Sequence, residues 1–210
     1  MSHDDFAVEP VPGLPERPPE GEHILWQGKP DWWRLSVESL SLNWVAGYFV
    51  FLAAWRFVTL VDQMTLMAAF AASAPLLIMG AVVCAILMVV GYVQARATLY
   101  TITNRRVAMR IGAALTVTLN LPYTQIGRAD FKPGKHGTGT ITFDLMGDTR
   151  LSYLVCWPHV RPWVMRRTQP ALRCIPEAEK IAALIAETAE TRIATPRVER
   201  APSQPAMAAE

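Results

Sequence analysis

Hydrophobic residues follow two different patterns along the chain, and the change between them comes at Arg96. No charged residue and no histidine lies between Asp62 and Arg96, and an earlier apolar stretch covers residues 42–61. A helix of about 20 apolar residues spans the hydrocarbon core of a bilayer. The pattern therefore predicts two membrane-spanning helices, within 42–61 and 65–93, which a short polar connection joins into an antiparallel hairpin over 42–95.

After this hairpin, apolar positions alternate with polar ones, which is the period of two typical of half-buried β-strands. The alternation covers five short segments, 99–103, 107–111, 115–121, 140–145 and 151–155. Strands this short and closely spaced suit a small antiparallel barrel or sandwich. From Pro176 the period becomes helical, because Ile181, Leu184, Ile185 and Thr188 share one face. The sequence therefore predicts an α+β membrane protein, in which a two-helix transmembrane hairpin precedes a small antiparallel β domain over 97–193 that a C-terminal helix closes.

The two ends of the chain differ in composition from the rest. Residues 1–20 are acidic and rich in proline, and residues 194–210 consist mainly of Ala, Pro, Ser and charged residues. Such segments bury little apolar surface, so we expect both to be disordered. Between the first arm and the hairpin lies a juxtamembrane segment, 21–41, with a short extended stretch followed by Trp32 and Trp33. Tryptophan beside charge before a span is typical of the membrane interface, so both side chains are expected at the membrane surface.

Composition changes this picture mainly by excluding classes of protein. Hydrophobic residues make up 51% of the 210 residues, an excess concentrated in the hairpin, which argues against an ordinary soluble enzyme. The net charge of +2 hides an acidic start and a basic second half. Lysine and arginine precede the first span and follow the second, so the positive-inside rule predicts two cytoplasmic termini. No recognisable nucleic-acid-reading module accompanies the basic half, so no nucleic acid partner is expected.

Three arginines, Arg105, Arg106 and Arg110, follow the second span closely. Basic residues near a membrane attract anionic lipid, by about 1 kcal/mol each. We therefore expect these three side chains to form a membrane-surface site. The alternative is an ordinary solvated face that only reflects the topology of the chain.

A second candidate site is the stretch from Trp157 to Trp163, which follows a predicted strand. Tryptophan and arginine dominate the energetics of protein interfaces, so Trp157, His159, Arg161 and Trp163 are candidates for docking a partner. Simple packing of a rigid loop is the alternative interpretation. Cys156 and His159 would suit a nucleophile and its base, but no third group that would orient them is evident nearby. We therefore predict no catalytic residue.

Several motifs resemble a known family. Gly21-Glu22 through Gly28-Lys29-Pro30, and Tyr100 to Arg106 followed by Gly112, resemble the bacterial pleckstrin-homology-like (PH-like) membrane proteins. Within that group, the stretches 13–15, 119–122 and 157–163 resemble the photosynthetic reaction-centre assembly proteins of purple bacteria.

The resemblance implies a PH-like fold for 97–193 and a location in the bacterial inner, intracytoplasmic photosynthetic membrane. It also implies a non-enzymatic assembly role, with reaction-centre subunits as partners and an effect on the surrounding light-harvesting antenna. The alternative is a membrane-surface module that binds lipid or protein and has no photosynthetic client.

Cofactor and metal binding are not expected. The four histidines lie outside both spans, which excludes a bacteriochlorophyll held by histidine inside the membrane. Ligation of a pigment near the interface by His23 or His159 is the alternative. The three cysteines fit no metal spacing, and their odd number argues against a disulfide framework. Small residues in the second span permit close helix approach, within the hairpin, in a homodimer or with a client helix.

Overall fold

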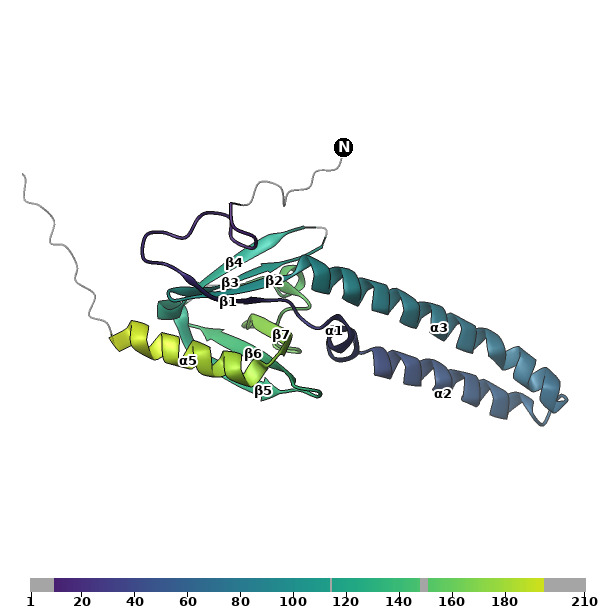
Figure 1. Cartoon of the computed structure of the whole chain (residues 1–210). Helices are drawn as coiled ribbons and strands as arrows, with labels where there is room; N and C mark the ends of the chain where they lie inside the picture. Colours follow the sequence, from purple (N-terminus) through teal and green to yellow (C-terminus); the bar gives the residue numbers. More distant parts are fainter. Residues whose placement is uncertain (1–9, 114, 148–150, 195–210) are drawn as a thin grey trace, which may run out of the picture.

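The computed structural model describes residues 10–113, 115–147 and 151–194. A β domain lies at one end, and two long helices extend from it side by side (Figure 1). These helices are α2 (Leu42–Leu60) and α3 (Leu66–Ala97), and a shorter helix α1 (Trp32–Glu38) precedes them. Both long helices are apolar and long enough to cross a membrane, and most of their surface is exposed. The predicted hairpin is confirmed.

Close helix approach in the hairpin depends on two glycines of α3. A Cβ atom added to Gly80 would lie 2.6 Å from Cβ of Phe49 on α2. One added to Gly91 would lie 2.0 Å from Oγ of Ser36 on α1. Glycine therefore lets α1 and α2 pack directly against the backbone of α3, as small residues do in membrane helices.

The β domain consists of two antiparallel sheets. The first contains β1 (Ile24–Gly28), β2 (Leu99–Thr103), β3 (Arg106–Ile111) and β4 (Val117–Pro122) in that order. The second contains β5 (Ile126–Pro133), β6 (Thr138–Leu145) and β7 (Ala171–Pro176), also in chain order. A 3-10 turn η2 (Tyr123–Gln125) connects the sheets, and a short helix α4 (Tyr153–Cys156) lies between β6 and β7. Helix α5 (Ala178–Ala194) follows β7.

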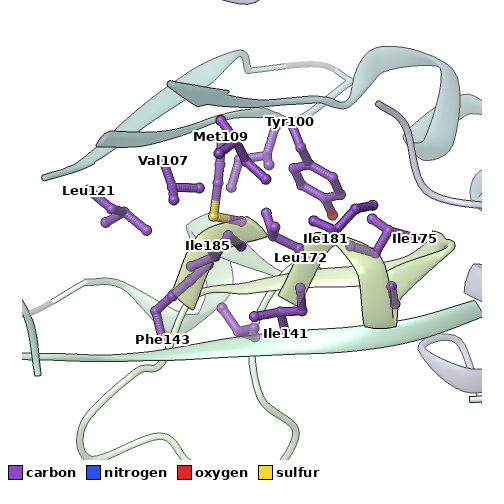
Figure 2. Close-up of a cluster of buried hydrophobic side chains, with 14 of the residues drawn as sticks. Tyr100, Val107, Met109, Leu121, Ile141, Phe143, Leu172, Ile175, Ile181 and Ile185 are labelled. Carbon is purple, nitrogen blue, oxygen red and sulfur yellow. The ribbon is translucent and has the colours of Figure 1, made fainter. Parts of the chain in front are cut away.

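The hydrophobic core lies between the two sheets and is completed by α5. Figure 2 shows Met109 and Leu121 from the first sheet facing Ile141, Phe143 and Leu172 of the second. Ile181 and Ile185 of α5 are buried in the same cluster, as the helical period predicts. The α+β fold with its closing helix is therefore confirmed.

The predicted domain boundary at residue 97 is wrong in one respect. Strand β1 precedes the hairpin in sequence, yet it pairs with β2, with Gly28 opposite Tyr100. The β domain is therefore built from both sides of the helical hairpin. Its first strand comes from the predicted juxtamembrane segment, 21–41.

The prediction of a disordered arm over 1–20 is also wrong where the structure describes it. Leu14 is fully buried, and Gly13 lies against the side chain of Leu99 on β2. The side-chain amide of Gln27 donates to the carbonyl of Pro12 over 2.9 Å. The stretch around Gly13 and Leu14 therefore packs on the first sheet. Residues 1–9, like residues 195–210 of the predicted tail, lie outside the described part of the chain.

Local predictions differ from the structure at α4, β5 and β7. The segment 151–155 alternates like a strand but contains the start of helix α4. Strands β5 and β7 show no clear alternation and were not predicted. In β7 the residues Ala171–Ile175 are all buried, because both faces of the strand are covered. One face packs against the hydrophobic core, and α1 with the β1–α1 connection covers the other.

Candidate functional site

The four predicted docking residues have different environments. The side chain of Trp163 is 88% exposed and that of Trp157 is 40% exposed. Arg161 is half exposed, with its guanidinium 3.1 Å from Oε1 of Gln169 and 3.6 Å from Asp130 on β5. His159 is completely buried. The assignment of His159 to a docking surface is therefore wrong, because its ring belongs to the interior of the domain.

Both ring nitrogens of His159 have partners far away in sequence. Nε2 lies 3.0 Å from Oγ1 of Thr98, and Nδ1 lies 2.6 Å from the hydroxyl of Tyr100. The Thr98 hydroxyl donates its proton to the carbonyl of Gln94 over 2.8 Å. It therefore accepts from Nε2–H, which leaves Nδ1 to accept the proton of Tyr100. In turn, the backbone N–H of Arg173 donates to the Tyr100 oxygen.

This network requires a neutral imidazole. Burial, together with the charge of Arg173 nearby, lowers the pKa of His159 to about 3. Burial also raises the pKa of Tyr100 well above its usual value, which keeps that hydroxyl protonated and able to donate. A second proton on the ring would face the hydroxyl proton of Tyr100 and would have no acceptor. The ring is a neutral structural link.

Cys156 and His159 do not form a nucleophile and base pair in this arrangement. Both ring nitrogens of His159 are engaged by Thr98 and Tyr100. Burial raises the pKa of the Cys156 thiol, which disfavours the thiolate that nucleophilic attack needs. Among the described residues, no group of three or more His, Cys, Asp or Glu side chains is placed to hold a metal ion.

Around this buried link the chain presents a set of exposed apolar side chains. We call residues 153–165 the docking segment. Its exposed apolar members are Leu154, Val155, Trp157, Trp163 and Met165. Sequence reasoning identified the two tryptophans but not Leu154, which is 85% exposed, because the alternation there indicated a strand with one buried face. An exposed set of large apolar residues is typical of an interaction surface.

Backbone pairing and ionic contacts hold the docking segment to the second sheet. The N–H of Ala171 donates to the carbonyl of His159, and the N–H of Arg161 donates to the carbonyl of Gln169, each over 2.9 Å. Just beyond the segment, Arg167 contacts Asp144 of β6 and donates to the carbonyl of Leu145. Buried Cys156 and Val160 add apolar packing. The exposed side chains therefore project from a well-supported base.

Trp163 has an unusual backbone conformation. Its φ angle is 65°, in the left-handed region where a non-glycine residue costs about 1–3 kcal/mol. Its side chain recovers little of that energy by burial, since 88% of it is exposed. Stability of the isolated chain therefore does not explain why tryptophan occupies this position.

The predicted basic membrane-surface site is not formed. Arg106 pairs with Glu22 over 2.9 Å, and Arg105 donates to the carbonyl of Glu20 over 2.9 Å. Arg110 is only 7% exposed. The first two lie at the β2–β3 turn, at the opposite end of β2 from helix α3. Arg105 and Arg106 hold the N-terminal segment on the sheet and Arg110 is buried, so the expectation of a shared lipid-binding face is wrong.

Trp32 and Trp33 lie on α1, with 41% and 46% of their surfaces exposed. Their rings contact each other edge to face, and Trp32 contacts Tyr92 of α3 in the same way. This aromatic group lies beside the end of the hairpin nearest the β domain, as the predicted interfacial position requires. The membrane-surface role of the two tryptophans stays a prediction.

A junction that sequence reasoning missed joins α1 to β7. The Arg173 guanidinium donates to Oγ of Ser39 over 2.8 Å and to the carbonyl of Val160. Cys174 lies 3.6 Å from a carboxylate oxygen of Glu38, and burial together with that charge raises the pKa of its thiol to about 12. Arg173 and Ser39, like Cys174 and Glu38, are more than 130 residues apart, so no local pattern indicates the junction.

Comparison with known proteins agrees with this architecture. The model of the bacterial PH domain family matches residues 44–189. A protein of Rhodobacter capsulatus, described as an uncharacterized 23.7 kDa protein in the puhA 5′ region, is 47% identical over 204 residues, which cover 96% of this chain and 95% of that protein. No solved structure matches. The chain belongs to the bacterial PH domain family.

Proposed function

We propose that the protein is a membrane-anchored, non-enzymatic assembly factor for the photosynthetic reaction centre, with an effect on the surrounding light-harvesting antenna. The proposal is supported by the family and by the apolar hairpin. It is also supported by the relative in the puhA 5′ region, which is a photosynthesis-related context. The resemblance of residues 157–163 to the PuhB assembly proteins of purple bacteria supports it as well. In this proposal the hairpin crosses the inner photosynthetic membrane, and both termini are cytoplasmic.

The observation that carries the proposal is the environment of Trp163. A large aromatic side chain is held in the left-handed region of backbone conformation and is almost fully exposed. Unfavourable backbone geometry persists at sites where it serves binding or switching. Tryptophan is also the residue type most enriched among side chains that dominate binding energy. A partner that covers Trp163 accounts for both features.

The partner that we propose is a reaction-centre subunit. Trp157, Trp163 and Leu154 would bury apolar surface against it, while the contacts of Arg161 and Arg167 keep the backbone fixed. A surface that is already ordered loses little conformational freedom on docking. The buried His159 would act indirectly, because its hydrogen bonds to Thr98 and Tyr100 hold the backbone of the docking segment in place.

The test replaces Trp163 by glycine in a photosynthetic purple bacterium whose own copy of the gene has been removed. Glycine accepts φ near 65° without strain, so Trp163→Gly removes the exposed ring while leaving the fold at least as stable. Leu115→Ala is the matched control, because Leu115 is 83% exposed but lies outside the docking segment. Reaction-centre absorption and the amount of this protein in the membrane are measured together.

We expect Trp163→Gly to reduce reaction centre severalfold with a normal amount of this protein, and Leu115→Ala to change neither. Normal reaction-centre levels in the Trp163→Gly strain would contradict the role of Trp163. Normal levels in the strain without the gene would contradict the assembly function itself. The latter result would favour a membrane-surface module without a photosynthetic client.

A further inference from the structure

The turn between β5 and β6 presents basic residues that no contact described above uses. We call residues 132–137 the basic hairpin. Lys132, Lys135 and His136 are exposed, and neither lysine belongs to an ion pair among the described residues. This turn is separate from the arginines of the β2–β3 turn, which contact the N-terminal segment.

The basic hairpin lies at the end of the β domain from which the long helices emerge. Its neighbour Thr138 pairs with Pro176 at the end of β7, and the N–H of Glu177 donates to the carbonyl of Gly137 over 3.0 Å. Two residues before Pro176, the carbonyl of Cys174 accepts from the N–H of Asp31, the residue that caps α1. Figure 1 shows the β5–β6 turn pointing toward the side of α1 and α2. The turn therefore faces the membrane if the hairpin crosses it.

Hydrogen bonds within the turn fix its shape. The N–H of Gly134 donates to the carbonyl of Thr138, and the hydroxyl of Thr138 donates to the carbonyl of Lys135, both over 2.8 Å. Lys132 and Lys135 therefore project from an ordered backbone. Only the side chains would lose freedom on contact with a charged surface.

Other charges at this end leave a positive excess. Lys29 and Arg96 are exposed beside the start of the β domain, where the Lys29 ammonium lies 3.5 Å from the carbonyl of Arg96. The acidic groups nearby are largely engaged. Glu177 pairs with Lys180 over 3.0 Å, Glu38 pairs with Arg34, and the carboxylate of Asp31 caps α1. Glu179 is exposed on the first turn of α5 and belongs to none of the described ion pairs.

We propose that the basic hairpin, together with Lys29 and Arg96, binds the anionic headgroups of the bilayer that holds α2 and α3. The inference rests on the membrane anchoring proposed above. A bilayer is the favoured partner because the turn points toward the side of α1 and α2, the end from which the hairpin emerges, and α1 carries the exposed Trp32 and Trp33. This contact would fix the tilt of the β domain on the membrane, and thereby the direction in which the docking segment points.

The experiment uses the full chain in nanodiscs, with a fluorescent label on a single reactive cysteine and a quencher attached to lipid headgroups. The label is placed by Pro133→Cys, next to Lys132, in a chain in which Cys84→Ala removes the accessible native thiol. Cys156 and Cys174 stay, because both are buried. Thr124→Cys, at the exposed turn near the opposite end of the domain, is the matched control site. Discs of phosphatidylcholine alone are compared with discs that also contain phosphatidylglycerol.

We expect quenching at position 133 only when phosphatidylglycerol is present, and none at position 124. Replacing Lys132 and Lys135 by glutamine should weaken this contact about 5-fold per lysine. High salt should abolish it, because the Debye length falls to about 3 Å at 1 M. Equal quenching at the two sites, or no dependence on phosphatidylglycerol, would overturn the inference. Insensitivity to both lysine replacements would also overturn it and would favour a protein partner for this turn.

A separate label on native Cys84 distinguishes failure of the inference from failure of the proposed anchoring. Cys84 lies in α3 and is partly exposed. A quencher on the lipid acyl chains should reduce its emission strongly. If it does so while position 133 stays unquenched, the hairpin spans the membrane but the basic hairpin does not contact it. If Cys84 is not quenched, the membrane anchoring itself is wrong.

Discussion

Thr98 is the residue that caps the C-terminal end of helix α3, and its hydroxyl accepts the Nε2–H of His159 over 3.0 Å. The hydroxyl donates in turn to Gln94 in the last turn of that helix. His159 lies within the docking segment, 61 residues later in the chain. The surface that we propose to bind a partner is therefore fixed directly to the end of the second candidate span. Membrane helix and docking segment are expected to move as one body.

His159→Ala should destabilise the protein strongly without touching any exposed surface. The change leaves a cavity in the interior and leaves the Tyr100 hydroxyl without its acceptor. Loss of a buried hydrogen-bond partner costs about 1–3 kcal/mol, to which the cavity adds. Thermal unfolding in detergent measures the effect. His136→Ala, at an exposed histidine, is the control, and an equal change in both variants would contradict the structural role of His159.

The same histidine predicts how stability depends on pH. The pKa of His159 is about 3 in the folded chain, below the usual value of 6.5 that the unfolded chain regains. Between these two pH values the unfolded state binds a proton that the folded state does not. The contribution of neutral His159 to the free energy of unfolding is therefore complete above pH 6.5 and is lost as the pH falls toward 3. The expected slope is at most about 1.4 kcal/mol per pH unit. His159→Gln should flatten this part of the curve in urea titrations, and an unchanged slope would exclude His159 as its source.

The β domain should not fold properly from residues 97–193 alone. That fragment lacks β1, which covers the edge of β2, and it lacks Leu14, which is fully buried. A fragment in which residues 10–30 are joined to residue 97 by a flexible linker should unfold cooperatively. Within that fragment, Leu14→Ala should cost roughly 2–5 kcal/mol. Cooperative unfolding of 97–193 at the same midpoint as the joined fragment would contradict the structural importance of β1.

Packing of α1 against α3 should depend on Gly91. A methyl group there would meet Oγ of Ser36, a buried residue, so Gly91→Ala should destabilise by about 1–3 kcal/mol. Emission from Trp32, which contacts Tyr92, should change as α1 shifts. Gly47→Ala is the control, since a Cβ at Gly47 has no neighbour within 4 Å. Equal tolerance of both changes in unfolding and emission measurements would show that α1 does not pack closely on α3.

Elements whose environment follows from the local pattern of apolar residues were predictable from the sequence. An uncharged run long enough to cross a bilayer predicts a helix, and alternation predicts β2, β3, β4 and β6. Strand β7 was not predictable, because both of its faces are covered and the alternation disappears. Strand β5 was missed because the small residues Gly127 and Ala129 stand where large apolar residues would indicate a strand.

The candidate site was predictable only in part, for a related reason. Trp157 and Trp163 are noticeable in the sequence by residue type, and both are exposed. His159 lies between them in the sequence, which suggested the same role, but its partners are Thr98 and Tyr100, 61 and 59 residues away, distances that no local pattern covers. The assignment of the arginines to a membrane surface was wrong for the same reason, since Arg106 pairs with Glu22, which precedes the helical hairpin in the sequence.

Contact between the docking segment and a reaction-centre subunit is the central claim, and crosslinking from position 163 tests it most directly. A photoreactive amino acid replaces Trp163 in cells that are assembling photosynthetic complexes, and a second strain carries the same group at exposed Leu115. Irradiated membranes are then analysed for covalent adducts by mass spectrometry. The account predicts adducts with reaction-centre subunits from position 163 and not from position 115. Adducts from neither position, or equal yields from both, would contradict it.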